Sequence, residues 1–270
     1  MAHRIAFHSA RAGTGKSTIV ANLATILVVS GYRVGILDAN LQSALMHQYF
    51  SLDVNHPFPT LNQYLLGECQ AQQMVYDVTP RTTPTLPGQV LLLPASTDAQ
   101  ALEQVLRNGY NTDRITDTLV SLIDQLQFDF FLIDTHAGWQ ERTLLTMLSM
   151  AIVDTLLIVM RLDQNDYQGT GVLLDLAREL EVPNIALVLN QVAMHVSHEQ
   201  VQERIEQTYQ CPVMALLEYS DHPTLVTQNH LFVLKHPRHP LTQSLKQLAM
   251  LLVQTSPMSK EAGASEPSSL

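Results

Sequence analysis

Continuous apolar runs alternate with amphipathic segments along most of the chain. Strand-like runs occupy residues 3–9, 33–38, 90–94, 128–134, 155–160, 184–190 and 212–217. Most of them are too uniformly apolar for a half-solvated strand, which is typical of a parallel sheet buried on both faces. Helical spacing of apolar residues follows residue 18 up to Gly31 and recurs at 60–66, 98–107, 113–126, 141–150, 167–181, 198–209 and 240–253. The pattern predicts an α/β fold with a doubly wound, mostly parallel sheet flanked by helices.

Length and composition favour one large domain. The chain has 270 residues, of which 46% are hydrophobic, enough for a substantial core. We expect a single domain over residues 1–254. Residues 255–270 are rich in Ser, Pro, Ala, Gly and Glu, so we expect them to form a disordered tail.

Composition also limits the compartment and the class of partner. No apolar run reaches the ~18 to 20 residues of a membrane span, and no basic-then-apolar leader opens the chain, so we expect a cytoplasmic protein. The net charge is −10 with scattered cations, which gives no strong nucleic-acid signal. Lys246 is the only cation of the 240–253 helix, so we expect that helix to pack on the sheet and not to anchor a membrane. Cys69 and Cys211 lie far apart, which argues against a disulfide or a cysteine metal site.

Residues 10–18, Ala-Arg-Ala-Gly-Thr-Gly-Lys-Ser-Thr, form a candidate phosphate-binding loop between a strand and a helix. In that position, backbone N–H groups and the positive end of the helix dipole meet at one spot. Lys16 can reach the β- and γ-phosphates, and the Ser17 hydroxyl can join a Mg²⁺ shell. Ala10 stands where the first glycine is expected, which is tolerable if its φ is negative. We expect the chain to bind a nucleoside triphosphate.

Carboxylates end two of the predicted strands. Ligands of doubly wound sheets bind beyond the carboxyl ends of the strands, where Asp38 and Asp134 lie. The run Phe-Phe-Leu-Ile before Asp134 has the form of a Walker B strand, whose Asp holds Mg²⁺ through a water. The alternative is a plain turn Asp that ends a strand.

At these motifs the chain resembles the MinD/ParA group of deviant-Walker P-loop ATPases, from about residue 3 to about residue 253. Residues 11–17 match the K-G-G-x-G-K-[ST] loop, residues 38–40 the D-x-D, residues 134–138 the D-x-P-A-G turn, and Asn190 ends the matching strand, with residues 216–221 as the second base-contacting loop. The resemblance implies ATP and Mg²⁺ as cofactors. It implies a nucleotide site of Ala12, Gly13, Thr14, Gly15, Lys16, Ser17, Thr18, Gly138 and Asn190, metal ligation through Ser17, Asp38 and Asp134, and catalytic roles for Lys16, Asp38, Asn40 and Arg11.

Four residues depart from the family pattern. One of them is Ala12, which stands where the family's loop has a glycine. Arg11 replaces the lysine that crosses the interface of an ATP-bound dimer; it either does the same or faces solvent. Asn40 replaces the Asp that orients the attacking water, so that hydrolysis is slowed, or it only closes a turn. His136 replaces Pro, and we expect an exposed turn histidine.

Residues 161–169 follow another buried strand. They either cap a helix through Asn165 or Asp166, or form part of the dimer face, and the two readings are compatible.

The resemblance implies an ATPase switch that forms a homodimer with ATP and engages a protein partner, which the sequence does not identify, for intracellular positioning or regulation. The alternative is an ATP-binding regulatory module with little or no hydrolysis, which Asn40 and Ala12 motivate. A metal-insertion or electron-transfer protein ranks last, because it predicts paired cysteines at the dimer face and the chain has none.

Overall fold

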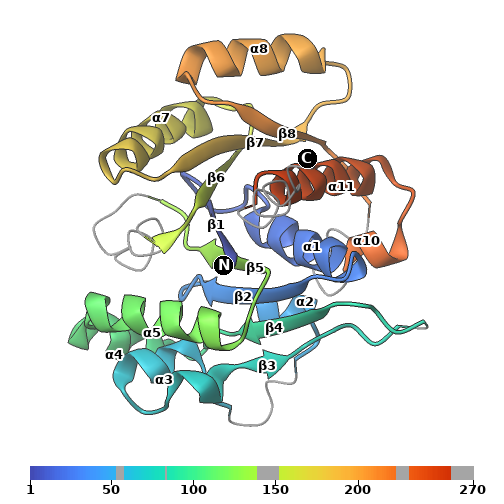
Figure 1. Cartoon of the computed structure of the whole chain (residues 1–270). Coiled ribbons are helices and arrows are strands. Elements are labelled where there is room, and N and C mark those ends of the chain that lie inside the picture. The colour runs from blue at the N-terminus through green and yellow to red at the C-terminus, as the bar shows by residue number, and fades with distance from the viewer. Residues whose placement is uncertain (53–57, 83, 139–151, 223–230, 257–270) are drawn as a thin grey trace, which may run out of the picture.

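Eight strands form one sheet in the order β3-β4-β2-β5-β1-β6-β7-β8 (Figure 1). The computed structural model describes residues 1–52, 58–82, 84–138, 152–222 and 231–256. The strands are β1 (His3–His8), β2 (Arg33–Ala39), β3 (Tyr76–Asp77), β4 (Gln89–Leu93), β5 (Phe130–Thr135), β6 (Thr155–Met160), β7 (Asn184–Val192) and β8 (Val213–Glu218). All neighbours pair in parallel except β3, which runs antiparallel to β4 at the edge.

Helices cover both faces of the sheet (Figure 1). They are α1 (Lys16–Val29), α2 (Met46–Tyr49), α3 (Leu61–Leu66), the 3-10 helix η1 (Ala71–Met74), α4 (Ala99–Asn108), α5 (Thr112–Gln125), α7 (Gln164–Glu179), α8 (His198–Tyr209), α10 (Phe232–Lys235) and α11 (Pro240–Gln254). Alternate residues of each central strand pack against α1, α10 and α11 on one face and against α5, α7 and α8 on the other. No described helix is long and apolar enough to cross a bilayer.

The structure confirms the predicted fold class, and each predicted strand lies within two residues of its observed bounds. The elements that sequence periodicity missed, β3, α2, η1 and α10, have two to four residues each, too few to show a period. Helix α7 begins at Gln164, three residues before the predicted start. The predicted helix at 141–150 lies outside the described residues. So does the predicted tail, apart from Thr255 and Ser256, and Ser256 is buried.

Strand register brings the predicted carboxylates together. Asp38 of β2 pairs directly with Asp134 of β5, and Phe7 of β1 pairs with Asp134 on its other side. Because β1 lies between β5 and β6, the loop that follows β1 emerges beside Asp134. The topology therefore builds one polar site at the carboxyl edge of the sheet.

A buried histidine fixes the ends of β1 and β5 to each other. His8 Nε2 donates to the Gly138 carbonyl at 2.9 Å, and His8 Nδ1 lies 2.6 Å from the Thr135 hydroxyl. The Gly138 amide in turn donates to the Ser9 carbonyl at 2.9 Å. Burial, followed by the charge of Lys16, lowers the pKa of His8 from 6.5 to about 3. His8 therefore stays neutral and holds the turn after β5 against the start of the loop after β1.

The pKa of His8 predicts a pH-dependent stability. Below pH 6.5 the unfolded chain gains a proton on His8 that the folded chain refuses until about pH 3, so the free energy of unfolding falls as pH drops through this window. Between pH 7 and pH 5, urea unfolding of the wild type is expected to lose about 2 kcal/mol more than that of His8→Gln. Glutamine keeps a donor for Gly138 and does not titrate. Equal losses in the two proteins would contradict the prediction.

Candidate nucleotide-binding site

The loop after β1 has the backbone of a phosphate cradle. Gly13 and Gly15 have positive φ angles of 81° and 90°, a region that favours glycine. Gly15 is the N-cap of α1, so the helix N-terminus opens directly onto the loop. Neither Ala10 nor Ala12 has a positive φ, which meets the condition that the sequence set for an alanine at position 10.

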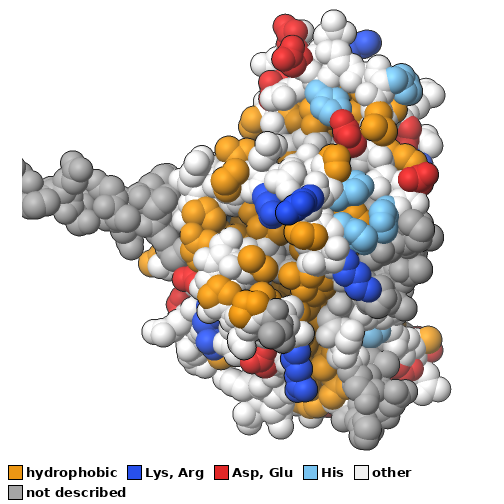
Figure 2. Space-filling view, turned by 90° about the vertical axis from the view of Figure 1, so that its right-hand side faces the viewer, with side chains coloured by type: hydrophobic (Ala, Val, Ile, Leu, Met, Phe, Trp, Pro, Cys, Tyr) orange, Lys and Arg blue, Asp and Glu red, His pale blue; other side chains and the backbone are white. Residues whose placement is uncertain are grey.

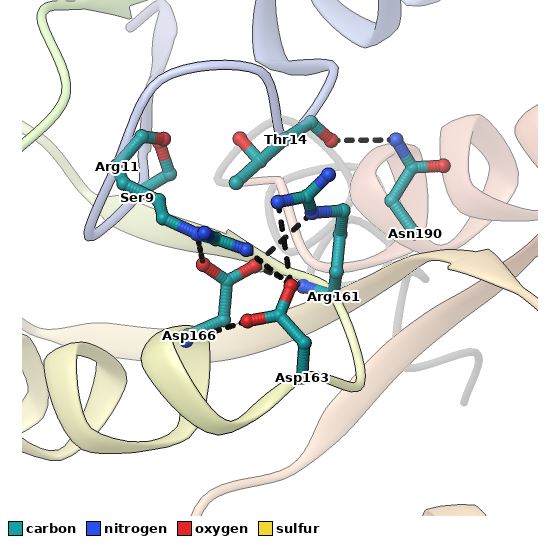
Figure 3. Close-up of polar contacts among 7 residues, drawn as sticks. All are labelled: Ser9, Arg11, Thr14, Arg161, Asp163, Asp166 and Asn190. Carbon is teal, nitrogen blue, oxygen red and sulfur yellow. Dashed lines mark hydrogen bonds and ion pairs between the residues drawn. The ribbon is translucent and has the colours of Figure 1, made fainter.

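Asn190, at the end of β7, holds the loop from the other side. Its Nδ2 donates to the Thr14 carbonyl at 2.7 Å (Figure 3). A Cβ on Gly15 would lie 2.4 Å from that nitrogen, so Gly15 provides both the left-handed backbone and the room for Asn190. A cavity of about 220 Å³ opens here, lined by Thr18, Asn190, Gln191 and residues 217–220 among others. The predicted base-contacting segments at Asn190 and 216–221 therefore line one cavity.

Lys16 lies between two carboxylates in the site. Its side chain is buried, and burial lowers its pKa, while the charges of Asp134 and Asp38 oppose that shift. Burial and the charge of Asp134 together raise the pKa of Asp38 to about 8, although three backbone amides that donate to its carboxylate oppose the rise. Burial also raises the pKa of Asp134, although the charge of Lys16 and the hydrogen bond from Ser17 lower it in part. Two buried carboxylates facing one ammonium make a site that favours an added cation.

The donor set fits Mg²⁺. Ser17 Oγ donates to Asp134 Oδ2 at 2.6 Å, and the other oxygen of Asp134 is buried without a hydrogen-bond partner among the described residues. An unpartnered buried carboxylate oxygen costs free energy unless a water or cation meets it. Among those same residues no three His, Cys, Asp or Glu side chains form a ready-made metal cluster. Mg²⁺ needs none, since it is usually held by one or two protein oxygens with phosphates and waters.

Arg11 belongs to a cluster of two arginines and two aspartates (Figure 3). Its guanidinium donates to Asp163 through Nη2 and to Asp166 through Nε. Arg161 pairs with the same carboxylates, at 3.3 Å to Asp163 and 3.5 Å to Asp166. The Arg11 side chain is 35% exposed while that of Asp166 is 1% exposed, so a buried carboxylate holds a half-exposed guanidinium at the entrance of the loop.

The cap of α7 differs from the sequence expectation. Asp163 is the N-cap residue, and its Oδ1 accepts from the Asp166 amide, whereas the sequence predicted Asn165 or Asp166. Asp166 is instead buried, and its Oδ2 accepts from the Arg161 amide at 2.8 Å. The physical reason is the earlier helix start, which moves the cap back along the chain and places Asp166 in the first turn.

Asn40 and His136 touch across the ends of β2 and β5. His136 Nδ1 donates to the side-chain oxygen Oδ1 of Asn40 at 3.0 Å, and the backbone amide of Asn40 donates to Asp38 Oδ1 at 3.2 Å. The expected exposed turn histidine is thus wrong: His136 is half-buried, and burial and the charge of Lys16 lower its pKa. Asn40 is buried, and its contact with Asp38 places it beside one of the metal-ligand candidates.

The structure thus brings the predicted residues Arg11–Thr18, Asp38, Asn40, Asp134, Gly138 and Asn190 to one edge of the sheet. Sequence reasoning missed the roles of His8, Thr135 and Asp163. A polar residue inside an otherwise apolar strand end was the available signal for His8 and Thr135. Sequence reasoning also missed Tyr49, whose hydroxyl lies 2.7 Å from Thr18 Oγ1.

Comparisons with known proteins agree with this geometry. An uncharacterized ATP-binding protein of Methanocaldococcus jannaschii is 25% identical over 254 residues, which cover 94% of this chain and 88% of that protein. An iron–sulfur cluster carrier protein of Methanococcus maripaludis is 26% identical over 70% of this chain and 60% of its own length. The structure of the septum site-determining protein MinD with Mg-ADP from Pyrococcus horikoshii superposes with a TM-score of 0.74, at 22% identity and covering 98% of this chain and 99% of that one.

The family match extends over most of the chain. The AAA domain family matches residues 2–191, which include the loop after β1, both strand-end carboxylates and Asn190. The sheet order and the helical layers are those of the MinD and ParA ATPases. The chain therefore belongs to the AAA domain family of P-loop ATPases and has the MinD/ParA fold.

Proposed function

We propose that the chain is a cytoplasmic ATP-dependent switch that binds Mg-ATP, dimerises with it, engages a protein partner and hydrolyses ATP slowly. The convergence of Lys16, Ser17, Asp38 and Asp134 on the N-terminus of α1 is the observation that carries this proposal. Lys16 and the loop amides bind the phosphates. Ser17 and Asp134 hold Mg²⁺, directly or through water, and Mg²⁺ supplies neutralisation of the charge that develops on the phosphates.

Asn190 supports adenine as the base. Its Nδ2 is committed to the Thr14 carbonyl, so its Oδ1 is the atom left to face a ligand. A carboxamide oxygen accepts from the exocyclic amine of adenine and repels the carbonyl that guanine has in the same place. The amide orientation set by the loop therefore favours ATP over GTP.

Arg11 supports the dimer. Its ion pairs hold it at the entrance of the loop, where Asp163 and Asp166 keep it charged and oriented. A guanidinium can exchange two carboxylate oxygens for two phosphate oxygens with the same planar geometry. We place Arg11 on the phosphates of the partner subunit in the ATP-bound dimer and on Asp163 and Asp166 before it forms.

Asn40 supports slow hydrolysis. Its backbone amide donates to Asp38, which places residue 40 beside that carboxylate, but an Asn side chain cannot remove a proton from water. Since the loose transition state of phosphoryl transfer requires positioning more than deprotonation, Asn40 reduces the rate without abolishing it. The second candidate function, an ATP-binding module with almost no turnover, rests on the same residue and differs only in that rate.

Metal carriage stays the last candidate. Cys69 lies between α3 and η1 beyond the β4 side of the sheet, whereas Cys211 is buried before β8 at the opposite edge. Burial raises the pKa of Cys211 to about 11, which disfavours the thiolate that a cluster needs.

Nucleotide binding is tested by calorimetry with Mg-ATP and Mg-GTP. We expect saturable binding of ATP, weaker binding of GTP, and at least about a tenfold loss of ATP affinity in Lys16→Ala, because a charge-assisted contact to phosphate is removed. Lys246→Ala, a lysine remote from the site, is the matched control and should bind as the wild type does. If the wild type bound neither ATP nor GTP in this titration, the proposed function would be refuted.

Arg11→Ala tests the dimer. ATP-dependent dimerisation, measured by light scattering, and turnover are both expected to fall at least about a hundredfold, while ADP affinity stays unchanged. Asp163→Asn breaks an ion pair of Arg11 but keeps the guanidinium, so it controls for the loss of the cluster and should retain turnover. If the wild type stays monomeric with ATP and Arg11→Ala has unchanged turnover, Arg11 does not contact the phosphates of a partner subunit.

Asn40→Asp tests the chemistry. Restoring a carboxylate beside the attacking water is expected to raise turnover about ten- to a hundredfold, whereas Asn40→Ala should lower it. Steady-state phosphate release under saturating Mg-ATP measures both. Equal rates for the Asn and Asp proteins would mean that position 40 does not limit hydrolysis.

A further inference from the structure

Acidic residues are absent from two long segments of this acidic chain. The sequence has 25 Asp and Glu against 15 Lys and Arg, yet residues 1–37 and 222–260 contain no Asp or Glu. The helices of these two segments, which are far apart in the sequence, lie on the same face of the sheet, where α1 packs against both α10 and α11 (Figure 1). One side of the molecule therefore has the opposite charge balance from the rest.

Cations and apolar side chains mix on the outer surface of this layer. Lys235, Arg238 and Lys246 are exposed, and no ion pair joins them to a carboxylate of the described residues. Lys246 Nζ reaches only the Pro237 carbonyl, at 3.4 Å. Figure 2 shows basic and histidine side chains distributed around hydrophobic ones on this face, with acidic side chains toward its margins. The surface is suited to a partner with negative charge and apolar side chains.

A groove lies between the C-terminal half of α1 and α11. Its volume is about 520 Å³, and Ile26, Val29, Leu234, Met250 and Val253 are among the residues that line it, with Lys246 at its wall. Val29 is 46% exposed and Met250 is 57% exposed, although both are large and apolar. On α11 the lining positions 246, 250 and 253 follow helical spacing, so they form a stripe along the groove.

ATP binding does not explain this charge balance. Helix α1 has 14 residues and is about 21 Å long, with the phosphate loop at its N-terminus and the groove at its C-terminal half. Charges separated by that distance are screened at physiological ionic strength, where the Debye length is about 8 Å. Excluding carboxylates from the phosphate site therefore gives no reason to exclude them from the groove.

We propose that the groove between α1 and α11 binds an acidic amphipathic helix of a protein partner. The concave apolar floor accepts side chains at helical spacing, and the three exposed cations meet acidic residues along the flank of that helix. A flat anionic membrane fits less well, because a groove leaves its floor out of reach and three cations contribute only about 3 kcal/mol at a lipid surface. The surface is complete without nucleotide, so the inference stands or falls independently of ATP hydrolysis.

The test is a selection of random peptides from a display library on the full-length protein. The enriched peptides are expected to carry apolar residues at helical spacing with Asp or Glu beside them, and to bind in fluorescence anisotropy. Lys246→Glu and Met250→Asp are each expected to weaken that binding about tenfold. Val172→Asp is the matched control, at an apolar position on α7 that is 46% exposed and lies across the sheet from the groove, and it should bind as the wild type does.

Several outcomes would overturn the proposal. They are an absence of enriched peptides, peptides without acidic bias, and binding that Lys246→Glu and Met250→Asp leave unchanged while circular dichroism shows folded variants. Sedimentation with phosphatidylglycerol–phosphatidylcholine vesicles that only those two substitutions abolish would assign the face to a membrane instead. Binding that appears only after removal of residues 257–270 would assign the groove to the chain's own tail. Self-association lost in Met250→Asp would assign it to a second copy.

Discussion

Two carboxylates at the carboxyl ends of β2 and β5, Asp38 and Asp134, are buried together with the ammonium of Lys16 from α1. Strand register fixes this arrangement, because Asp38 and Asp134 are direct partners in the pairing of β2 with β5. Burial raises the pKa of both aspartates, the charge of Asp134 adds to the rise at Asp38, and a carboxylate oxygen of Asp134 is left without a hydrogen-bond partner within the described part of the chain. The Mg²⁺ and polyphosphate of the proposed function would satisfy these groups.

A second charged cluster lies at the same edge and is balanced in itself. Arg11 and Arg161 face Asp163 and Asp166, two charges of each sign. Such a cluster costs little to keep in the nucleotide-free chain, since each buried acceptor has a donor. In the proposed ATP-bound dimer, Arg11 would exchange one set of charge-assisted hydrogen bonds for another of similar strength. It would then have partners in both states, as a two-state contact requires.

The central sheet and the phosphate loop were predictable, because apolar runs and glycine spacing reflect strong local constraints. Asp38 and Asp134 were predictable as site residues because each directly ends such a run. Contacts that depend on three dimensions were not. His8 donates to Gly138, 130 residues away, and Arg11 pairs with Asp166, 155 residues away. Local patterns carry no signal for such pairs, so the sequence left a solvent-facing Arg11 open as the alternative and predicted an exposed His136.

Asn40 and His136 show how two departures from a family pattern explain each other once they touch. Each was interpreted alone, Asn40 as the loss of a carboxylate and His136 as an exposed turn histidine. In the folded chain, the Asn40 oxygen accepts from His136 Nδ1, so the pair connects the ends of β2 and β5 beside the candidate metal ligand Asp38. Burial and the nearby Lys16 keep the imidazole neutral, so the pair adds no charge to the site. A carboxylate at position 40 would add a third acidic group to the two already buried there. The asparagine therefore lessens a repulsion that the unliganded site would otherwise have to bear.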